Sequence, residues 1–189
     1  MKKLKKILVL AGLMVVASGV SSTSHASVKF SVFGSGVYPQ TVSGDILGVS
    51  SEFKGKLGFG GGAALEVMLG QKVGLEFGGT YMIRKIDFTA LGATTELERK
   101  AVYIPAGLRI HLSRAFSIQL GGFYDLNLES ADDPYYGLQG GVRVDIPLGG
   151  TTSLFVDARY NYSLKEVSGF KFNDLVLASV GIAFGGKGK

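Results

Sequence analysis

The chain of 189 residues contains no cysteine and no tryptophan, and it has only four prolines. Without cysteine the protein cannot form disulfides, so packing and hydrogen bonds must hold the fold together. A long apolar segment is also missing, because the apolar run at residues 7–20 is shorter than the roughly 20 residues that a membrane-spanning helix requires. The composition therefore argues against a disulfide-stapled protein and against a transmembrane helix.

The first 26 residues have the three parts of a secretory signal peptide. Four lysines precede the apolar run, and Ser24-His25-Ala26 offers small residues at positions −3 and −1 of a cleavage site. We expect residues 1–26 to be a signal peptide that is cleaved after Sec-type export. Residues 27–189 are short enough to form a single domain.

Neither sign of charge dominates once this segment is set aside. The chain has 20 basic and 15 acidic residues, and four of the basic ones lie in the signal segment, so 16 basic and 15 acidic residues remain. The basic character of the whole sequence thus belongs to the signal segment. We expect no nucleic-acid partner for the remainder.

The remainder is rich in alternation between apolar residues and small or polar ones. This period of two predicts β-strands with two different faces. The runs are longer than the ~5–6 residues of common strands and suit a tilted strand that crosses a bilayer in ~9–11 residues. The eight runs are 28–38, 56–69, 73–86, 99–112, 116–129, 135–148, 152–165 and 174–184.

The polar faces of these runs are rich in short residues. Along residues 116–121, for example, the sequence Phe-Ser-Ile-Gln-Leu-Gly alternates apolar with polar or small residues. The chain contains 29 glycines, about twice the usual share of ~7%. Glycine suits a crowded interior and is a costly choice for a solvated strand surface. We therefore expect the polar faces to point into a barrel and the apolar faces to meet lipid.

Aromatic residues on the apolar faces fall at two heights along the runs. Tyrosine joins an apolar ring to a hydroxyl group, which suits it to a membrane–water interface. Two aromatic girdles are typical of outer-membrane barrels. The expected girdles are Tyr38, Tyr81, Tyr124, Tyr136, Tyr160 and Tyr162 at one end, and Phe30, Phe116 and Phe184 at the other.

Short and long connections alternate between the runs. The short ones are 70–72, 113–115 and 149–151, and the long ones are 39–55, 87–98, 130–134 and 166–173. A three-residue turn keeps the apolar residues of both flanking runs on one face. The runs and their connections predict an all-β fold. A sheet in lipid must close into a barrel, because lipid cannot form hydrogen bonds with the backbone groups of a free sheet edge. We expect an eight-stranded antiparallel up-and-down transmembrane β-barrel with short periplasmic turns and longer extracellular loops.

This pattern resembles the small outer-membrane β-barrel family, the OmpA transmembrane-domain and OmpX-like proteins of Gram-negative bacteria. The resemblance covers residues 27–185 and includes the segments VYIPAGLRIHL at 102–112 and VLASVGIAF at 176–184. It implies a protein of the cell outer membrane that contacts outer-membrane lipid and lipopolysaccharide and is inserted by the outer-membrane assembly machinery. We expect a monomer without cofactor or metal.

Inward-pointing positions collect charges of both signs. The turn rule places Glu66 opposite Glu76, and two facing carboxylates repel each other. We therefore expect Arg109 to compensate them, and Arg143 to pair with the facing Asp157. Because the interior of an eight-stranded barrel is just wide enough for side chains, we predict a filled polar interior; the alternative is a narrow, porin-like channel or gate. The full set is Glu66, Glu76, Arg84, Arg109, Asp125, Arg143, Asp145, Asp157 and Arg159.

An enzymatic alternative concerns His111 and Ser113. Some small outer-membrane barrels modify lipid A, and a deacylase of this type uses a His-x-Ser arrangement, which His111-Leu112-Ser113 superficially matches. Here, however, Ser113 begins a periplasmic turn, whereas lipid A lies in the outer leaflet. The small residues that follow the serine in the deacylase motif are replaced by Arg114-Ala115-Phe116. We therefore expect no catalytic residues and no enzyme.

The long connections offer a surface for an extracellular ligand. The connection 39–55 is the longest, Asp132-Asp133 makes an acidic tip in 130–134, and Phe170 and Phe172 flank a lysine in 166–173. Two adjacent acids without further ligands make a weak cation site. We predict a structural or surface-interaction role, with an extracellular ligand contacting 39–55 and 130–134.

Overall fold

The structure, a computed structural model, describes residues 27–39, 42–46, 49–90, 93–129, 134–165 and 175–185. The expected signal peptide lies outside the described residues, as do Asp132-Asp133 and the connection 166–173. Among the described residues, no helix is long and apolar enough to cross a membrane. The strands are β1 (Val28–Pro39), β2 (Val42–Ile46), β3 (Val49–Met68), β4 (Val73–Ala90), β5 (Ala93–His111), β6 (Phe116–Asn127), β7 (Tyr135–Gly149), β8 (Thr152–Ser163) and β9 (Leu175–Gly185).

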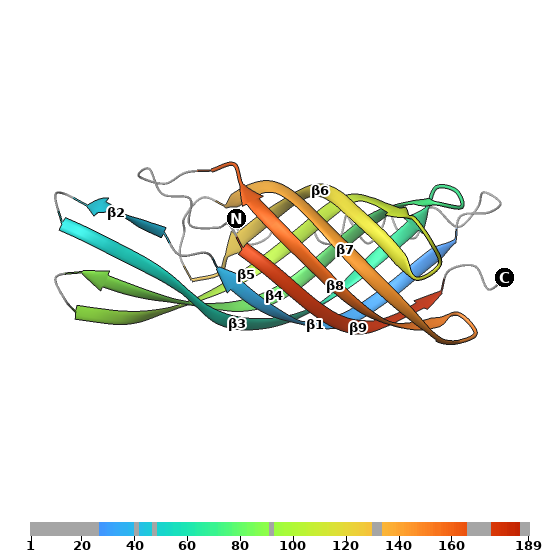
Figure 1. Cartoon of the computed structure of the whole chain (residues 1–189), viewed down its shortest axis with the longest axis horizontal. Coiled ribbons are helices and arrows are strands. Elements are labelled where there is room, and N and C mark those ends of the chain that lie inside the picture. The colour runs from blue at the N-terminus through green and yellow to red at the C-terminus, as the bar shows by residue number, and fades with distance from the viewer. Residues whose placement is uncertain are drawn as a thin grey trace, which may run out of the picture.

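Eight of these described strands close into a ring. β1 pairs with β9 on one side and with β3 on the other, and from β3 to β9 each strand pairs with the next, always antiparallel. The ring fills the centre and right of Figure 1. The predicted eight-stranded antiparallel barrel is therefore confirmed, and β2 is an additional strand that pairs with β3 outside the ring.

The first two tight turns follow the predicted register. Glu66 lies opposite Glu76 across the β3–β4 hairpin, and His111 lies opposite Ser117 across the β5–β6 hairpin. A register of this kind keeps every inward residue of one strand beside an inward residue of the next. The turns therefore fix which charges meet inside the barrel.

The third tight turn differs from the prediction near its tip. Gly149 pairs with Thr152, after a register shift beyond Pro147, so the expected three-residue turn 149–151 is wrong. The φ angles of Gly149 and Gly150 are 125° and 58°. Glycine adopts positive φ angles without a steric penalty because it has no Cβ atom. The chain can therefore reverse over the two residues Gly150 and Thr151, next to a β-bulge.

The predicted loops 39–55 and 87–98 are also wrong, because both contain strand. β4 continues to Ala90 and β5 starts at Ala93, so 87–90 and 93–98 form the end of one long hairpin. Residues 42–46 form β2 and pair with residues 49–53 of β3. We call β2, residues 49–56 of β3, residues 85–90 of β4 and residues 93–98 of β5 the projecting sheet. Figure 1 shows it reaching far beyond the ring on the left.

A bulge in β3 separates the ring from the projecting sheet. The register of β3 with β4 shifts between Lys56 and Phe59. Phe59 points outward in the ring and is 59% exposed. On the far side of the bulge, Lys56 lies opposite Lys85, again on the outer face. The extra residue therefore re-aims the side chains of β3 where it leaves the ring.

The outside of the ring is apolar. Leu120, Leu138 and Val180 are each more than half exposed, which would be costly in water and is the surface that lipid requires. The structure places all nine expected girdle residues on this outer side, between 37% and 50% exposed: Phe30, Tyr38, Tyr81, Phe116, Tyr124, Tyr136, Tyr160, Tyr162 and Phe184.

The inside of the ring is narrow enough to need glycine where strands approach closely. Gly107 and Gly121 lie opposite each other on β5 and β6. A Cβ atom added to Gly121 would lie 2.5 Å from the Cα of Gly107, closer than real structures allow. The short residues on the inward faces thus make room for the long side chains described next.

Candidate functional site

Arg109 sits at the centre of the charged interior. It lies on β5, and its Nε donates to Glu76 Oε2 at 2.8 Å, while its Nη2 donates to the same oxygen. The Arg109 Nε is also 3.9 Å from Glu66 Oε2, and its Nη1 donates to Ser117 Oγ at 3.1 Å. All of these side chains are buried. The guanidinium therefore lies against both of the facing carboxylates.

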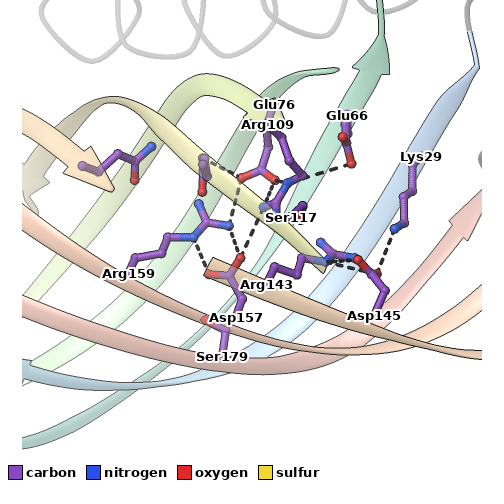
Figure 2. Close-up of polar contacts among 12 residues, drawn as sticks. Lys29, Glu66, Glu76, Arg109, Ser117, Arg143, Asp145, Asp157, Arg159 and Ser179 are labelled. Atoms are coloured by element: carbon purple, nitrogen blue, oxygen red, sulfur yellow. Dashed lines mark hydrogen bonds and ion pairs between the residues drawn. The ribbon is translucent and has the colours of Figure 1, made fainter. Parts of the chain in front are cut away.

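Arg159 on β8 completes a four-charge network. Its Nη2 lies 2.9 Å from Glu76 Oε1, and its Nε donates to Asp157 Oδ1 at 2.5 Å. Arg109 Nη2 lies 3.2 Å from Asp157 Oδ2, so two arginines bridge two carboxylates from opposite sides, as Figure 2 shows. Gln119 Nε2 adds a hydrogen bond to Glu76 Oε1 at 3.0 Å. A buried charge is tolerated when it is paired and hydrogen-bonded in this way.

The expected ion pair between Arg143 and Asp157 is wrong. The two residues do lie opposite each other on β7 and β8. Arg143, however, pairs with Asp145 two residues along its own strand, at 2.8 Å, and its guanidinium covers the Phe155 ring at 3.6 Å. Residues i and i+2 share a face of a strand, and Asp157 is already bound by the two arginines of the central network.

Asp145 also receives a charge that the sequence argument missed. Lys29 Nζ on β1 lies 2.8 Å from Asp145 Oδ1, and Ser153 Oγ donates to the same oxygen at 3.1 Å. Figure 2 shows Lys29 reaching Asp145 across the interior of the ring, since β9 and β8 lie between β1 and β7. Lys29 lies between the outward residues Val28 and Phe30. The alternation of the predicted strand 28–38 therefore already indicated that Lys29 points inward.

The last two expected interior charges form a separate pair. Arg84 on β4 binds Asp125 on β6 through its Nη2, and both side chains are buried. Arg84 also contacts the sulfur of Met82 on its own strand. Each of the nine expected interior charges thus lies within ion-pair distance of an opposite charge.

An apolar cluster fills the interior at the end remote from the tight turns. Sequence reasoning missed it, because an inward apolar residue such as Leu177 in the run Val176-Leu177-Ala178 does not stand out from its outward neighbours. The ring of Tyr103 packs on Phe123 with centroids 5.5 Å apart. Its hydroxyl lies 2.5 Å from Gln139 Oε1 and 3.0 Å from Asn161 Oδ1. The members are Val37, Met82, Ala101, Tyr103, Phe123, Leu175 and Leu177, all at most 4% exposed.

His111 and Ser113 are each engaged elsewhere. His111 Nε2 lies 2.6 Å from Glu66 Oε1. Ser113 Oγ accepts the backbone N–H groups of Ala115 and Phe116 at 3.2 and 3.0 Å, which closes the tight turn. A nucleophile needs a base within hydrogen-bond reach, and the contacts of these two side chains do not provide that arrangement.

The outer face of the projecting sheet carries a network of exposed charges. Lys56 Nζ lies 2.8 Å from Glu96 and 2.9 Å from Asp87, and Lys85 Nζ lies 3.2 Å from Glu96. The hydrogen bond from Lys56, followed by that from Lys85, lowers the pKa of Glu96 below its ordinary value. The hydrogen bond to Glu96 raises the pKa of Lys56. No group of three or more histidine or acidic side chains suited to a metal ion occurs among the described residues.

Comparison with solved structures identifies proteins of the same architecture. The outer membrane protein OprG from Pseudomonas aeruginosa superposes with a TM-score of 0.66 at 15% sequence identity, over 86% of this chain and 97% of that one. Ail of Yersinia pestis, solved with the heparin analogue sucrose octasulfate, gives 0.52 at 10% identity over 86% and 99%. Outer membrane protein AlkL gives 0.52 at 13% identity over 88% and 93%. No protein-family model and no curated protein sequence matches the chain.

These similarities show the fold: the chain has the eight-stranded barrel architecture of small outer-membrane proteins, as its sequence pattern predicts. The proteins that it resembles are outer-membrane proteins of Gram-negative bacteria, and the apolar outside of the ring is the surface that such a membrane requires. Proteins of this architecture serve varied roles, so the particular role of this chain has to be argued from its own residues.

Proposed function

We propose that this chain is an integral outer-membrane protein whose filled ring anchors the projecting sheet as an interaction surface outside the cell. The observation that carries the proposal is the difference in strand length. β3, β4 and β5 have 20, 18 and 19 residues, whereas β1, β6 and β8 have 12 each. The added length lies at the end remote from the periplasmic turns, where it cannot contribute to crossing the membrane.

The filled interior supports an anchor better than it supports a channel. The central charge network occupies the part of the ring nearer the tight turns, and the apolar cluster closes the other part. Ions that entered this packed interior would lose their hydration, which is costly in free energy. We expect the purified protein in a planar bilayer to show no discrete conductance above that of an empty bilayer.

The proposed route to the membrane follows the sequence. We propose that residues 1–26 are removed on export, that the outer-membrane assembly machinery inserts the ring, and that lipopolysaccharide surrounds its outer half. N-terminal sequencing of the mature protein tests the first step. A first residue other than Ser27 would place the cleavage site elsewhere.

The interaction role is tested by shortening the projecting sheet. Replacing residues 87–96 by Asn-Gly joins Ile86 to Leu97, which face each other, through a turn that hairpins favour. Cells that display the full chain should be retained on at least one member of a panel of immobilised cell-surface polysaccharides and proteins, and the shortened variant should lose that retention.

Two controls make this result interpretable. Both variants should shift on an unboiled gel of the outer-membrane fraction, which shows that the ring has folded. Gly70→Ala, in the tight turn at the opposite end of the ring, serves as the control because it leaves the projecting sheet unchanged. Equal retention of cells with the full and the shortened chain would contradict the proposed role.

A further inference from the structure

The end of the ring that carries the tight turns has two exposed cations. Lys72 lies in the turn between β3 and β4, and Arg114 lies in the turn between β5 and β6. Among the described residues, neither side chain takes part in an ion pair. The third tight turn, at residues 149–151, carries no charge. We call Lys72 and Arg114 the turn-side pair.

The two turns that hold this pair are neighbours around the ring. The backbone N–H of His111 donates to the carbonyl oxygen of Lys72 at 2.7 Å. The first turn is therefore bonded to β5 immediately before β5 enters the second turn. Both turns lie at the end of the ring opposite the projecting sheet (Figure 1). The two positive charges thus act on the same side of the ring and on the same region of its surroundings.

The exposed bases at the other end of the molecule are balanced by acids of the chain itself. Lys56 and Lys85 both bind Glu96, and Lys100 binds Glu129. The turn-side pair has no acid of this kind beside it among the described residues. Its two charges are therefore available to an anion that comes from outside the chain.

The depth of the two turns selects the kind of anion. Leu69 and Leu112, the last outward residues before the turns, are 60% and 58% exposed on the lipid-facing side. Lys72 is next to outward Val73, and Arg114 is two residues from Leu112. At ~3.3 Å per residue, both cations lie within about 3–7 Å of a lipid-facing residue. The headgroup layer extends roughly 5–8 Å beyond the hydrocarbon on each side of a bilayer, so the turns lie among the headgroups.

Phospholipid phosphate groups are the anions at that depth. A guanidinium group such as that of Arg114 binds phosphate through two parallel hydrogen bonds, and the ammonium group of Lys72 binds it as a compact point charge. Both side chains can keep their apolar stems on the lipid-facing surface and extend their charged ends into the headgroups. Peptidoglycan is another anionic partner, but it lies outside the membrane, and the short turns give the pair little reach beyond the headgroups.

We propose that Lys72 and Arg114 bind the phosphate groups of anionic phospholipids in the inner leaflet of the outer membrane. This site lies at the end of the molecule opposite the proposed interaction surface, so it goes beyond the proposed function and does not rest on it. Binding holds the turns in the headgroup layer and thereby fixes the depth of the ring in the membrane.

Native mass spectrometry of the refolded protein in a nonionic detergent measures which lipids stay bound. The probe is an equal mixture of phosphatidylglycerol and phosphatidylcholine with the same acyl chains. One basic residue near an anionic lipid surface gives about a fivefold preference, so the unmodified chain should prefer phosphatidylglycerol by roughly 25-fold. Lys72→Gln with Arg114→Gln should bind the two lipids nearly equally, and each single substitution should reduce the preference about fivefold.

Two control variants separate the site from the total charge of the protein. Lys54→Gln with Lys85→Gln removes the same number of positive charges from the projecting sheet and should leave the lipid preference unchanged. Lys72→Arg keeps the charge in the turn and should also leave it unchanged. All variants should shift on an unboiled gel, because substitutions of exposed residues have little effect on stability.

Four outcomes would overturn the inference. The first is an equal lipid preference of the unmodified chain and of the variant that lacks both turn-side charges. The second is an equal loss of preference in Lys54→Gln with Lys85→Gln, which would show attraction by total charge alone. The third is a preference that disappears in Lys187→Gln with Lys189→Gln while the turn-side pair is intact. The fourth is sedimentation of the unmodified chain with isolated peptidoglycan that the turn-side substitutions abolish, which would assign the pair to the cell wall.

Discussion

The ring and the projecting sheet use the same antiparallel ladder but face different surroundings. Along β4 the outward residues Phe77, Tyr81 and Ile83 are apolar or aromatic, and the next outward residues are Lys85 and Asp87. The outward face thus changes from apolar to charged between two successive outward residues, Ile83 and Lys85. The outward face is therefore apolar along the ring and charged along the projecting sheet, and we predict that the outer boundary of the membrane lies between Ile83 and Lys85.

The two regions also differ in how their charges are held. The ring buries its interior charges and pairs each of them with an opposite charge. In the projecting sheet, by contrast, Lys56 and Glu96 of the exposed ion pairs are each about 40% exposed. Breaking a buried pair leaves an uncompensated charge in a dry interior. Breaking an exposed pair leaves both groups in water and costs little. The same kind of substitution should therefore have very different effects in the two regions.

The largest effect is expected for Arg109→Ala, which leaves Glu76, Glu66 and Asp157 with less compensating charge. Loss of one partner from a buried ion pair costs about 3–5 kcal/mol, so the urea midpoint of the micelle-bound ring should fall sharply. Lys85→Ala in the projecting sheet is the control and should change stability by less than about 1 kcal/mol.

A second variant keeps this test meaningful if Arg109→Ala does not fold. The double variant Arg109→Met with Glu76→Gln removes one charge of each sign and should recover much of the lost stability. A double variant as unstable as Arg109→Ala alone would contradict the pairing described for the ring.

The next effect compares a leucine in each region. Leu120 lies on the lipid-facing side of β6, and Leu97 lies on the inner face of the projecting sheet. A lysine in the middle of the lipid-facing band costs about 2–4 kcal/mol, so Leu120→Lys should reduce the unfolding free energy by that amount. Leu97→Lys stays in water and should leave it nearly unchanged. Equal effects of the two substitutions would contradict the assignment of surroundings.

Much of the ring follows from the sequence, and the reasons are local. Each membrane strand must show lipid one face, so residues such as Leu120 and Val180 repeat with a period of two. Because the turns are short, that period also fixes the register that brings Glu66 beside Glu76. The partner of Arg143 does not follow, since a long side chain can reach along its own strand to Asp145 as easily as across to Asp157.

The projecting sheet was harder to predict. In the segment 87–98 the charged and threonine residues, such as Asp87 and Thr89, share the outer face, and apolar residues such as Phe88 lie on the inner face, which reverses the arrangement of the membrane strands. The search for an apolar outer face therefore predicted that this strand ends at Ile86, whereas β4 continues to Ala90. The regular return of Lys85, Asp87 and Thr89 to one face was the signal that could have extended it.

A smaller effect concerns the third turn. Gly150 has a φ of 58°, and a side chain in the left-handed region costs about 1–2 kcal/mol. Gly150→Ala should therefore lower the stability of the ring by roughly 1 kcal/mol, measured by urea unfolding. Gly70→Ala in the first turn, where a Cβ meets open space and φ is not in that region, is the matched control.

The smallest effect is a dependence of the projecting sheet on pH. The pKa of Glu96 is lowered in the folded state by Lys56 and Lys85, so its contribution is present above the ordinary carboxyl pKa and is lost as pH falls through the lowered value. The protection factors of residues 93–98 against hydrogen exchange, which correct for the intrinsic pH dependence of the rate, should fall below about pH 4, and Glu96→Gln should remove this fall. An unchanged pH dependence in that variant would assign it to another group.

The boundary between the two regions can be measured directly, because the chain has no cysteine of its own. Single cysteines at positions 75, 77, 81, 83, 85 and 87 of β4 would be tested in proteoliposomes with a membrane-impermeant maleimide. We predict protection from 75 to 83 and rapid labelling at 85 and 87. Rapid labelling at 75 and 77 would contradict the account, because the outward face of the ring would then lie in water rather than in lipid.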